Sequence, residues 1–267
     1  MRVAIIAIGD ELLSGKTLDY NSHWISKRLF SLGFRIALKI TVGDEENEIV
    51  EALKLCMRKA DIIITTGGLG PTPGDVTLSA IAKALNKKLV RDNDALEMIK
   101  RRYRELYEIG FIDSPDITKE REKMAILPEG AKPFYNPIGV APGVLIKYRG
   151  KYIIALPGVP SEMMYLLEAI IPNLPILRGK TIVSREWYID FRDESLLAKI
   201  LEEIMQKFKG NIRIKSYPVG FGRQVRMRII AVVENMPVEK AEELLRNVWE
   251  ELTMRISNVM GNREHTR

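Results

Sequence analysis

The sequence predicts an α/β protein with a mostly parallel sheet, followed by a small α+β domain. In the first part, apolar runs of strand character alternate with helical patterns, which favours a parallel sheet with helices on both faces. Pro172 and Pro175 then stand close together, which stops a helix and indicates a domain boundary. Beyond them the order of elements changes to β-α-β-β-α. We therefore expect one domain over residues 1–172 and a second over residues 176–260.

The elements of the first domain follow from hydrophobic periodicity. Short apolar runs rich in Ile and Val predict strands, and apolar residues on one helical face, such as Ile25 and Leu29, predict helices. Gly33 is expected to end the first long helix. The predicted strands are 3–8, 35–42, 62–66, 132–134, 143–148 and 152–156, and the predicted helices are 21–32, 45–59, 78–85, 94–108 and 161–171.

The second domain is predicted from a clear strand alternation between two helices. Met227 and Ile229 fall on one face of a strand, whereas Arg226 and Arg228 fall on the other. With Arg223 just before them, these arginines favour a solvated sheet face over an RNA-binding surface. The predicted strands are 181–191, 211–216 and 224–233, the predicted helices are 194–208 and 239–254, and the tail 262–267 is expected to fray.

Composition restricts the class of function. The 267 residues carry a formal net charge of +6 with both signs mixed, which suits an anionic small molecule better than nucleic acid. No apolar run approaches the ~20 residues that a membrane span needs. Cys56 is the only cysteine, so a disulfide framework and a thiolate zinc site are excluded, and we expect this side chain in the core. A cytoplasmic location is the expectation.

The most informative segment is the glycine-rich stretch 65–77, between a predicted strand and a predicted helix. Gly67, Gly68 and Gly70 let backbone N–H groups converge without obstruction by a Cβ atom, and the helix N-terminus adds a positive dipole end. This outline is that of a phosphate or pyrophosphate cradle. Its spacing matches neither the dinucleotide fingerprint nor the P-loop. A plain tight strand-to-helix turn is the alternative interpretation.

Three carboxylates follow three predicted parallel strands. Asp10, Asp44 and Asp75 are each placed at the carboxyl edge of the sheet, where ligands bind in such folds. Next to an anion cradle they require a divalent cation, and Mg²⁺ takes a few protein oxygens while phosphates supply the rest. Helix N-capping is the alternative role of all three residues.

A fourth loop, at residues 157–163, follows the predicted strand 152–156. Ser161 and Glu162 begin the next helix there, and for Glu162 a simple helix cap is the favoured interpretation. The segment 136–143 contains two prolines and two glycines. Such a rigid loop either walls a pocket or merely turns the chain.

These motifs together resemble the competence/damage-inducible protein A (CinA) family, which belongs to the wider MogA/MoaB-like molybdopterin-binding superfamily. The resemblance spans residues 1–170 and is carried in order by Gly9–Gly15, Asp19–Ser22, Thr66–Thr72 and Asn136–Gly143, and by Leu156–Met163. It implies a three-layer α/β/α fold with a molybdopterin-binding-like cleft, and an oligomer, dimeric or trimeric. Many members carry a further C-terminal amidase domain, which we expect this chain to lack.

The resemblance also implies roles for particular residues. Asp44 and Asp75 match the positions that serve metal-dependent adenylyl transfer in the superfamily, and we assign them as catalytic residues and, with Asp10, as metal ligands. Substrate or phosphate binding is assigned to Gly9, Asp10, Glu11, Asn21, Thr66, Gly67, Gly68, Gly70, Pro71, Thr72, Gly158, Ser161 and Glu162. The implied cofactor is a divalent metal, Mg²⁺ or a transition metal, with molybdopterin as a further candidate ligand.

The activity expected from this resemblance is hydrolysis of a nucleotide pyrophosphate bond, with ADP-ribose as the leading substrate. Molybdopterin adenylyltransferase is the alternative enzyme, and a non-catalytic pterin- or nucleotide-binding module is the alternative from another class. One difference from the family's usual sequence keeps the non-catalytic binding module open as an alternative. Gly74 stands where the family usually has the first of two consecutive aspartates, whereas Asp75 is retained.

Overall fold

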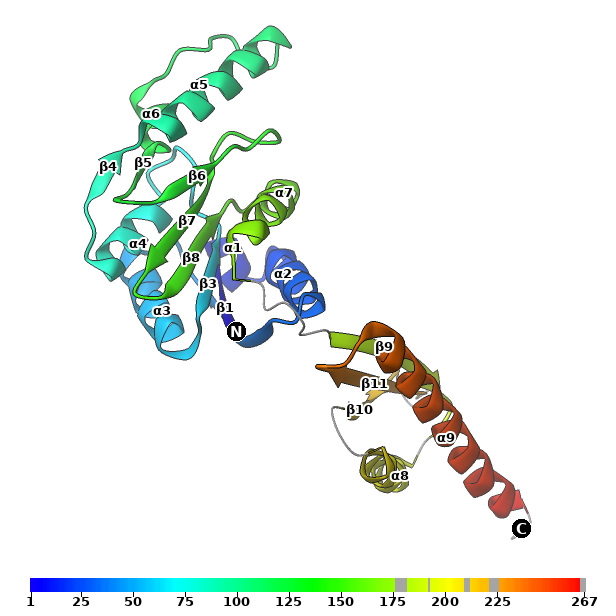
Figure 1. Ribbon diagram of the computed structural model, residues 1–267. Coiled ribbons are helices and arrows are strands. Elements are labelled where there is room, and N and C mark those ends of the chain that lie inside the picture. Colours follow the sequence, from blue (N-terminus) through cyan, green and yellow to red (C-terminus); the bar gives the residue numbers. More distant parts are fainter. Residues whose placement is uncertain (176–181, 192, 209–211, 221–225, 265–267) are drawn as a thin grey trace. The chain divides into compact units, whose positions relative to one another are not determined.

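A computed structural model describes residues 1–175, 182–191, 193–208, 212–220 and 226–264 of the chain. The chain forms two compact units (Figure 1). The first comprises residues 1–30 and 34–176, and the second comprises residues 31–33 together with the C-terminal part from residue 177. Within the described ranges, no helix is long and apolar enough to cross a membrane.

The first unit is built on a six-stranded sheet with the strand order β2-β1-β3-β8-β7-β6. Neighbours from β2 to β8 are parallel, whereas β7 runs antiparallel to β8 and β6 antiparallel to β7. The prediction of a mostly parallel sheet is therefore confirmed. The strands are β1 (Arg2–Ile8), β2 (Arg35–Val42), β3 (Ile62–Thr66), β6 (Lys132–Phe134), β7 (Gly143–Tyr148) and β8 (Lys151–Leu156).

Helices cover both faces of this sheet, with α3 and α4 on one side and α2 and α7 on the other (Figure 1). Arg28 of α2 pairs with Glu168 of α7 at 2.5 Å across the second of these layers. The helices are α1 (Asp10–Leu13), α2 (Tyr20–Ser31), α3 (Glu46–Lys59), α4 (Thr77–Leu85), α5 (Asn93–Glu108), α6 (Lys119–Lys123), α7 (Pro160–Ile170) and the short 3₁₀ turn η1 (Ile171–Asn173).

One pair of strands was not predicted. The strands β4 (Leu89–Arg91) and β5 (Ile126–Pro128) form a separate two-stranded antiparallel sheet. Each has three residues, too few to show a period of two, and their partner lies far away in the sequence. The strand β5 also lies next to α4.

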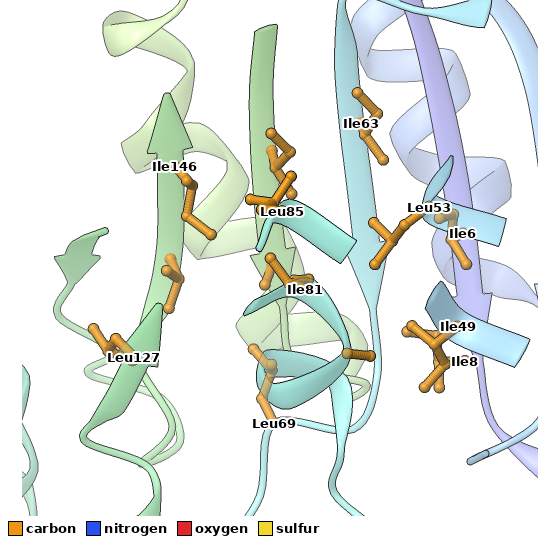
Figure 2. Close-up of a cluster of buried hydrophobic side chains, with 14 of the residues drawn as sticks. Ile6, Ile8, Ile49, Leu53, Ile63, Leu69, Ile81, Leu85, Leu127 and Ile146 are labelled. Atoms are coloured by element: carbon orange, nitrogen blue, oxygen red, sulfur yellow. The ribbon is translucent and has the colours of Figure 1, made fainter. Parts of the chain in front are cut away.

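The core between the sheet and the α3–α4 layer explains the apolar runs of the sequence. Every residue of β3 is buried, as expected for a central parallel strand covered on both faces. Figure 2 shows the side chains of Ile6, Ile63, Leu53 and Ile81 gathered between sheet and helices. Leu69, from the loop after β3, joins the same cluster and is 4% exposed. Cys56 is fully buried there, as predicted.

The second unit has the predicted β-α-β-β-α order. A three-stranded antiparallel sheet with the order β10-β11-β9 packs its buried face against α8 and α9. In β11 the predicted alternation is confirmed, since Met227 and Ile229 are buried whereas Arg226 is exposed. The elements are β9 (Ile182–Ile189), α8 (Glu194–Lys207), β10 (Ile212–Val219), β11 (Arg226–Glu234) and α9 (Val238–Glu264).

The last helix corrects the expectation of a frayed tail. We predicted a helix that ends at Met254, but α9 continues to Glu264, so Asn262–Glu264 are helical and only 265–267 lie outside the described residues. The apolar stripe of α9 extends to Val259, which packs against the core of the second unit. The predicted positions Thr181, Asn211 and Arg223–Val225 also lie outside the described ranges.

Candidate functional site

A cavity of about 440 Å³ opens at the carboxyl edge of the parallel strands. The loops after β1, β2, β3 and β8 all contribute to its wall, as the topology predicted. The predicted site residues that line it are Gly9, Glu11, Asp44, Gly67, Gly68, Gly70, Pro71, Asp75, Gly158 and Glu162.

The other predicted residues lie around this cavity rather than in its wall. Asn21 and Thr66 line a smaller cavity of about 100 Å³ that adjoins it. Asp10 and Thr72 form hydrogen bonds to Asp44 and Asp75, respectively. Ser161 is exposed in the first turn of α7 and contributes to neither cavity.

The backbone after β3 requires glycine at two consecutive positions. Gly67 has φ +110°, and a Cβ atom there would lie 2.2 Å from the carbonyl oxygen of Ile8. Gly68 has φ +67°, and a Cβ atom there would lie 2.3 Å from the hydroxyl of Thr77. This hydroxyl donates a hydrogen bond of 2.8 Å to the carbonyl of Gly67, which fixes the loop to the start of α4.

The backbone donors of this loop differ from the prediction at one of three positions. The N–H of Gly67 donates to the carbonyl of Leu156 at 3.0 Å, so it is not free to bind a diphosphate, as we had expected. By contrast, the consecutive N–H groups of Gly68, Leu69 and Gly70 find no protein acceptor in the described part of the chain. All three residues line the cavity. Successive unpaired N–H groups near a helix N-terminus form an anion-binding site.

Asp75 is held against this loop by Thr72. Its Oδ2 accepts hydrogen bonds from the backbone N–H of Thr72 at 2.8 Å and from the Thr72 hydroxyl at 2.5 Å. Gly70 leaves room for the carboxylate, because a Cβ atom there would lie 2.8 Å from Oδ2. Asp75 is not the N-cap of α4, since Val76 takes that position without a side-chain hydrogen bond. The capping interpretation is therefore wrong for Asp75.

Asp10 and Asp44 bind each other's backbone. The N–H of Asp10 donates to Oδ2 of Asp44 at 3.0 Å, and the N–H of Asp44 donates to Oδ1 of Asp10 at 3.3 Å. Gly9 and Glu45 are the N-caps of α1 and α3, and neither helix has a side-chain cap. The capping interpretation is thus also wrong for Asp10 and Asp44. Their reciprocal hydrogen bonds connect the loop after β1 to the loop after β2.

The three aspartates do not form one cluster. Asp44 and Asp75 line the cavity, whereas Asp10 does not. Within the ranges that the structure describes, no group of three or more His, Cys, Asp or Glu side chains is arranged to hold a metal ion. A cation in this cavity would therefore have two aspartates at most from the predicted set, and it would need oxygen ligands from its substrate.

Glu162 is a partly buried carboxyl in the cavity wall, not a helix cap. The N-cap of α7 is Val159, without a side-chain hydrogen bond. Burial raises the pKa of Glu162 above its ordinary value, although the hydrogen bond from Asn136 and the charge of Arg102 act against this rise. The Asn136 side-chain N–H donates to Oε2 of Glu162 at 2.7 Å. Gly139 leaves room for the carboxyl, because a Cβ atom there would lie 2.0 Å from Oε2.

The segment 136–143 walls the cavity and does more than turn the chain. Val140 and Ala141 line the cavity directly. Asn136, which is 2% exposed, donates a hydrogen bond to the carbonyl of Ala141 and accepts two from the backbone N–H groups of residues 138 and 139. Arg102 of α5 holds the outer side of the segment, with Nε donating to the carbonyl of Gly139 at 2.8 Å.

Sequence reasoning missed Tyr103 and Met124, which also line the cavity. The Arg121 guanidinium lies 3.9 Å from the centre of the Tyr103 ring. Burial raises the pKa of the Tyr103 hydroxyl, and the charge of Arg121 opposes this rise. Tyr103 falls at helical spacing on the buried face of α5, so the sequence pattern alone does not distinguish it from a core residue.

Comparison with known proteins identifies the class to which this fold and cleft belong. Residues 4–177 match the family described as "Probable molybdopterin binding domain". The chain therefore belongs to the molybdopterin-binding-domain family, and within it the chain is CinA-like, as the motifs indicated.

Individual relatives match most of the chain. The chain is similar to Protein TK1472 of Thermococcus kodakarensis, with 42% identity over 92% of this chain and 97% of the relative. It is similar to Protein PF0476 of Pyrococcus furiosus, with 43% identity over 92% of this chain and 96% of the relative. Among solved structures, the CinA protein of unknown function from Thermoplasma acidophilum is 35% identical, with a TM-score of 0.59 over 65% of this chain and 98% of that one.

Proposed function

We propose that this chain is a metal-dependent hydrolase that cleaves the pyrophosphate bond of a nucleotide, with ADP-ribose as the leading substrate. One observation carries the proposal: the unpaired N–H groups of residues 68–70 share one cavity with the carboxylates of Asp44 and Asp75. Donors of this kind bind a diphosphate, and carboxylates beside it suit a cation that bridges protein and phosphate. ADP-ribose is preferred because CinA-type domains, which the chain resembles, are associated with its cleavage.

The residues present fit a divalent cation that shares its coordination with the substrate. Asp44 and Asp75 would hold Mg²⁺ or a transition metal, in keeping with the preference of Mg²⁺ for one or two protein carboxylates together with phosphate oxygens. When bound, the metal would neutralise negative charge on the diphosphate oxygens. Thr72 contributes indirectly, because its two hydrogen bonds hold the carboxylate of Asp75 at the cavity wall.

In the proposed reaction, water forms a bond to one phosphorus atom while the bond to the bridging oxygen breaks. ADP-ribose would give AMP and ribose 5-phosphate. The N–H groups of residues 68–70 stabilise the charge on the phosphate oxygens, which is the main catalytic contribution of such donors. One carboxylate of the cavity wall orients the water. The raised pKa of Glu162 lets this side chain keep a proton at a higher pH than an ordinary carboxyl, next to the reacting groups.

The second candidate function is molybdopterin binding, with or without adenylyl transfer. The match of residues 4–177 to a probable molybdopterin-binding domain favours it. A transferase would use the same diphosphate-binding loop, with ATP as a substrate and pyrophosphate as a product. A non-catalytic module would bind the pterin without turnover, and Gly74 in place of the usual aspartate is consistent with this.

The decisive experiment is to measure AMP release from ADP-ribose with and without Mg²⁺ or Mn²⁺, in the wild type and in Asp75→Asn. The amide oxygen introduced by this substitution can still accept from the N–H of Thr72, so the loop should remain folded. We expect metal-dependent turnover that falls about 10²- to 10³-fold in the variant, the scale of losing one electrostatic contribution. Asp94→Asn, at an exposed aspartate in the first turn of α5, is the matched control and should keep full activity.

Full activity in Asp75→Asn would remove Asp75 from the mechanism. If no metal supports turnover, while the wild type binds molybdopterin, the binding function replaces the hydrolase.

We further propose that the protein acts in the cytoplasm as a homo-oligomer, because members of the superfamily are commonly oligomeric. A light-scattering mass equal to one chain would overturn the oligomer.

A further inference from the structure

A continuous chain of hydrogen bonds reaches the carboxyl of Glu162 from outside the main cavity. Nη2 of Arg102 donates to the carbonyl of Ile138 at 3.1 Å, and the N–H of the same peptide unit, which belongs to Gly139, donates to Oδ1 of Asn136 at 3.0 Å. Nδ2 of Asn136 then donates to Oε2 of Glu162 at 2.7 Å. Every bond of the chain is donated in the same direction, from the positive guanidinium toward the carboxyl.

The neighbouring groups fix the orientation of the Asn136 amide. Its Nδ2 also lies 2.9 Å from the carbonyl of Ala141, which can only accept, and its Oδ1 contacts the backbone N–H groups of Ile138 and Gly139, which can only donate. Rotating the amide by 180° would therefore lose all of these bonds. The residue is buried, so its side chain presents a fixed donor to Glu162.

The guanidinium of Arg102 is itself held through all three of its nitrogens. Nε and Nη2 donate to the carbonyls of Gly139 and Ile138, and Nη1 donates to Oε2 of Glu105 at 3.2 Å. The Tyr135 hydroxyl donates to the same oxygen of Glu105 at 2.6 Å. The side chain of Arg102 is 15% exposed, so water screens its charge less than that of a surface arginine. Because hydrogen bonds in a chain polarise one another, this charge acts on the group at the far end.

This arrangement leaves one oxygen of Glu162 for a ligand in the cavity. Oε2 accepts from Asn136, whereas Oε1 accepts no hydrogen bond from the residues that the structure describes. Two other carboxylates of the cavity wall, those of Asp44 and Asp75, are assigned to the metal. The carboxylate of Glu11 also lines the cavity, but it has no hydrogen-bond partner within the described ranges. Glu162 is therefore the remaining carboxylate that the protein holds in a fixed position.

Arg102 is the cationic neighbour of this carboxyl. Among the described residues, no lysine or arginine lines the cavity. On α7, the helix of Glu162, the carboxylate of Glu168 is paired with Arg28. Burial has the largest effect on the pKa of Glu162 and raises it, whereas the hydrogen bond from Asn136 and the charge of Arg102 lower it. The titratable groups that share the cavity with Glu162 are Glu11, Asp44, Asp75 and Tyr103.

From these contacts we infer that Glu162 accepts the proton of the attacking water, and that Arg102 and Asn136 are its positioning residues. This inference rests on the proposed function, for which it names the carboxylate that orients the water. As the water oxygen forms its bond to phosphorus, one water proton passes to Oε1 of Glu162 and the other stays on the new phosphate. The bridging oxygen leaves with the electron pair of the broken bond, and Glu162 then releases its proton to solvent.

Two neighbouring arginines provide a matched test of the positioning role. Arg102→Gln removes the cationic end of the chain. Arg101→Gln is the control, because Arg101 donates to the same Glu105 at 2.8 Å but forms no hydrogen bond to residues 136–143 in the described structure. Carbon-13 NMR of the metal-free protein follows the titration of the Glu162 carboxyl, whose signal is identified by its absence in Glu162→Gln. We expect the midpoint to move to higher pH in Arg102→Gln and to stay unchanged in Arg101→Gln. An unchanged midpoint in Arg102→Gln, or the same shift in both variants, would overturn the positioning role.

Steady-state kinetics of AMP release provide an independent test. Arg102→Gln should lower kcat about tenfold and change KM less than about twofold, because the diphosphate contacts remain whereas the proton acceptor is misplaced. Arg101→Gln should keep the wild-type kcat. Glu162→Gln keeps an oxygen that accepts from Asn136, so the loop should stay folded, and kcat should fall at least about a hundredfold. A kcat of Glu162→Gln close to that of the wild type would reject Glu162 as the proton acceptor.

The two proposals fail in different ways. AMP release that is unaffected in Glu162→Gln and Arg102→Gln would keep the hydrolase and reject the inference. No AMP release with any metal would reject the hydrolase and with it the proton transfer, whereas a shifted titration in Arg102→Gln would still show that Arg102 positions Glu162.

Discussion

The two units of this protein use buried polar side chains in different ways. In the second unit, the buried carboxylate of Glu251 is paired with Lys207 at 2.6 Å and with Arg255 at 2.7 Å. These contacts connect α8 with α9 and leave the carboxylate well satisfied. In the first unit, the buried polar side chains gather near the carboxyl ends of the strands. Buried atoms without a partner among the described residues occur in both units, namely Oδ1 of Asn21 and Oγ of Ser22 in the first and Nε of Arg228 in the second.

The two units therefore differ in where their buried polar side chains lie, not in whether every one of them is paired. A buried group that is fully paired contributes to packing and specificity of the fold. A buried group left unpaired costs free energy, whichever unit contains it. The comparison therefore separates the two units by where their buried polar groups lie, because those of the first unit gather at the edge of the sheet where the main cavity opens.

The largest effect is expected at the backbone of the phosphate-binding loop. Gly67→Ala would bring a Cβ atom within 2.2 Å of the Ile8 carbonyl and impose a strained φ of +110°. We expect the first unit to lose about 3 kcal/mol of unfolding free energy, combining strain and overpacking. Chemical denaturation measures this loss.

A control variant distinguishes the cost of the close contact with Ile8 from the cost of the positive φ. Gly150 also has a positive φ, +76°, but a Cβ atom there would meet nothing within 4 Å. Gly150→Ala should therefore cost only about 1 kcal/mol. Equal losses in the two variants would show that the contact with Ile8 is unimportant.

A second prediction compares one glutamate from each unit as the pH changes. Burial raises the pKa of Glu162, so its ionisation on going from acid to neutral pH costs folded-state stability. Glu162→Gln removes this cost, and the variant should gain stability relative to the wild type as the pH rises above about 4.5. Calorimetric melting at pH 4 and pH 7 measures the difference.

Glu251 should show the opposite sign. The hydrogen bond from Lys207, and then that from Arg255, lowers the pKa of Glu251, so its stabilising contribution is present above the unfolded pKa and is lost as the pH falls through the lowered pKa. Glu251→Gln should therefore destabilise the second unit at pH 7, by about 1 kcal/mol or less, and progressively less below about pH 4.5. The same sign in both variants would refute the contrast between the two units.

The smallest change in stability is expected at Gly74. A Cβ atom there would meet nothing within 4 Å, and φ is not in the positive range, so Gly74→Asp should change stability by less than about 0.5 kcal/mol. The added carboxylate stands next to Asp75 and should tighten Mn²⁺ binding in the presence of AMP. Isothermal titration measures the affinity, and an unchanged value would mean that this position does not face the metal.

The sequence by itself determined the class of fold and the edge of the sheet where the site lies. Apolar runs such as Ile62–Thr66 are typical of strands that a parallel sheet buries on both faces, and the ends of parallel strands meet at one edge. The motifs around Gly67, Asp75 and Glu162 therefore identified cavity residues in advance. Short-range patterns were enough to predict the fold class and the edge of the sheet that carries the site, because both depend on local hydrophobic periodicity and on the direction of the strands.

Only the tertiary structure decided how the individual groups are used. The N–H of Gly67 is taken by Leu156, Asp10 pairs with Asp44, and Tyr103 reaches the cavity from α5. Each of these outcomes depends on a partner that is distant in sequence, and the sequence pattern does not specify the distance or the direction of such a contact. The unpaired Oδ1 of Asn21 is the clearest case, because it becomes visible only when every neighbouring donor and acceptor has been placed.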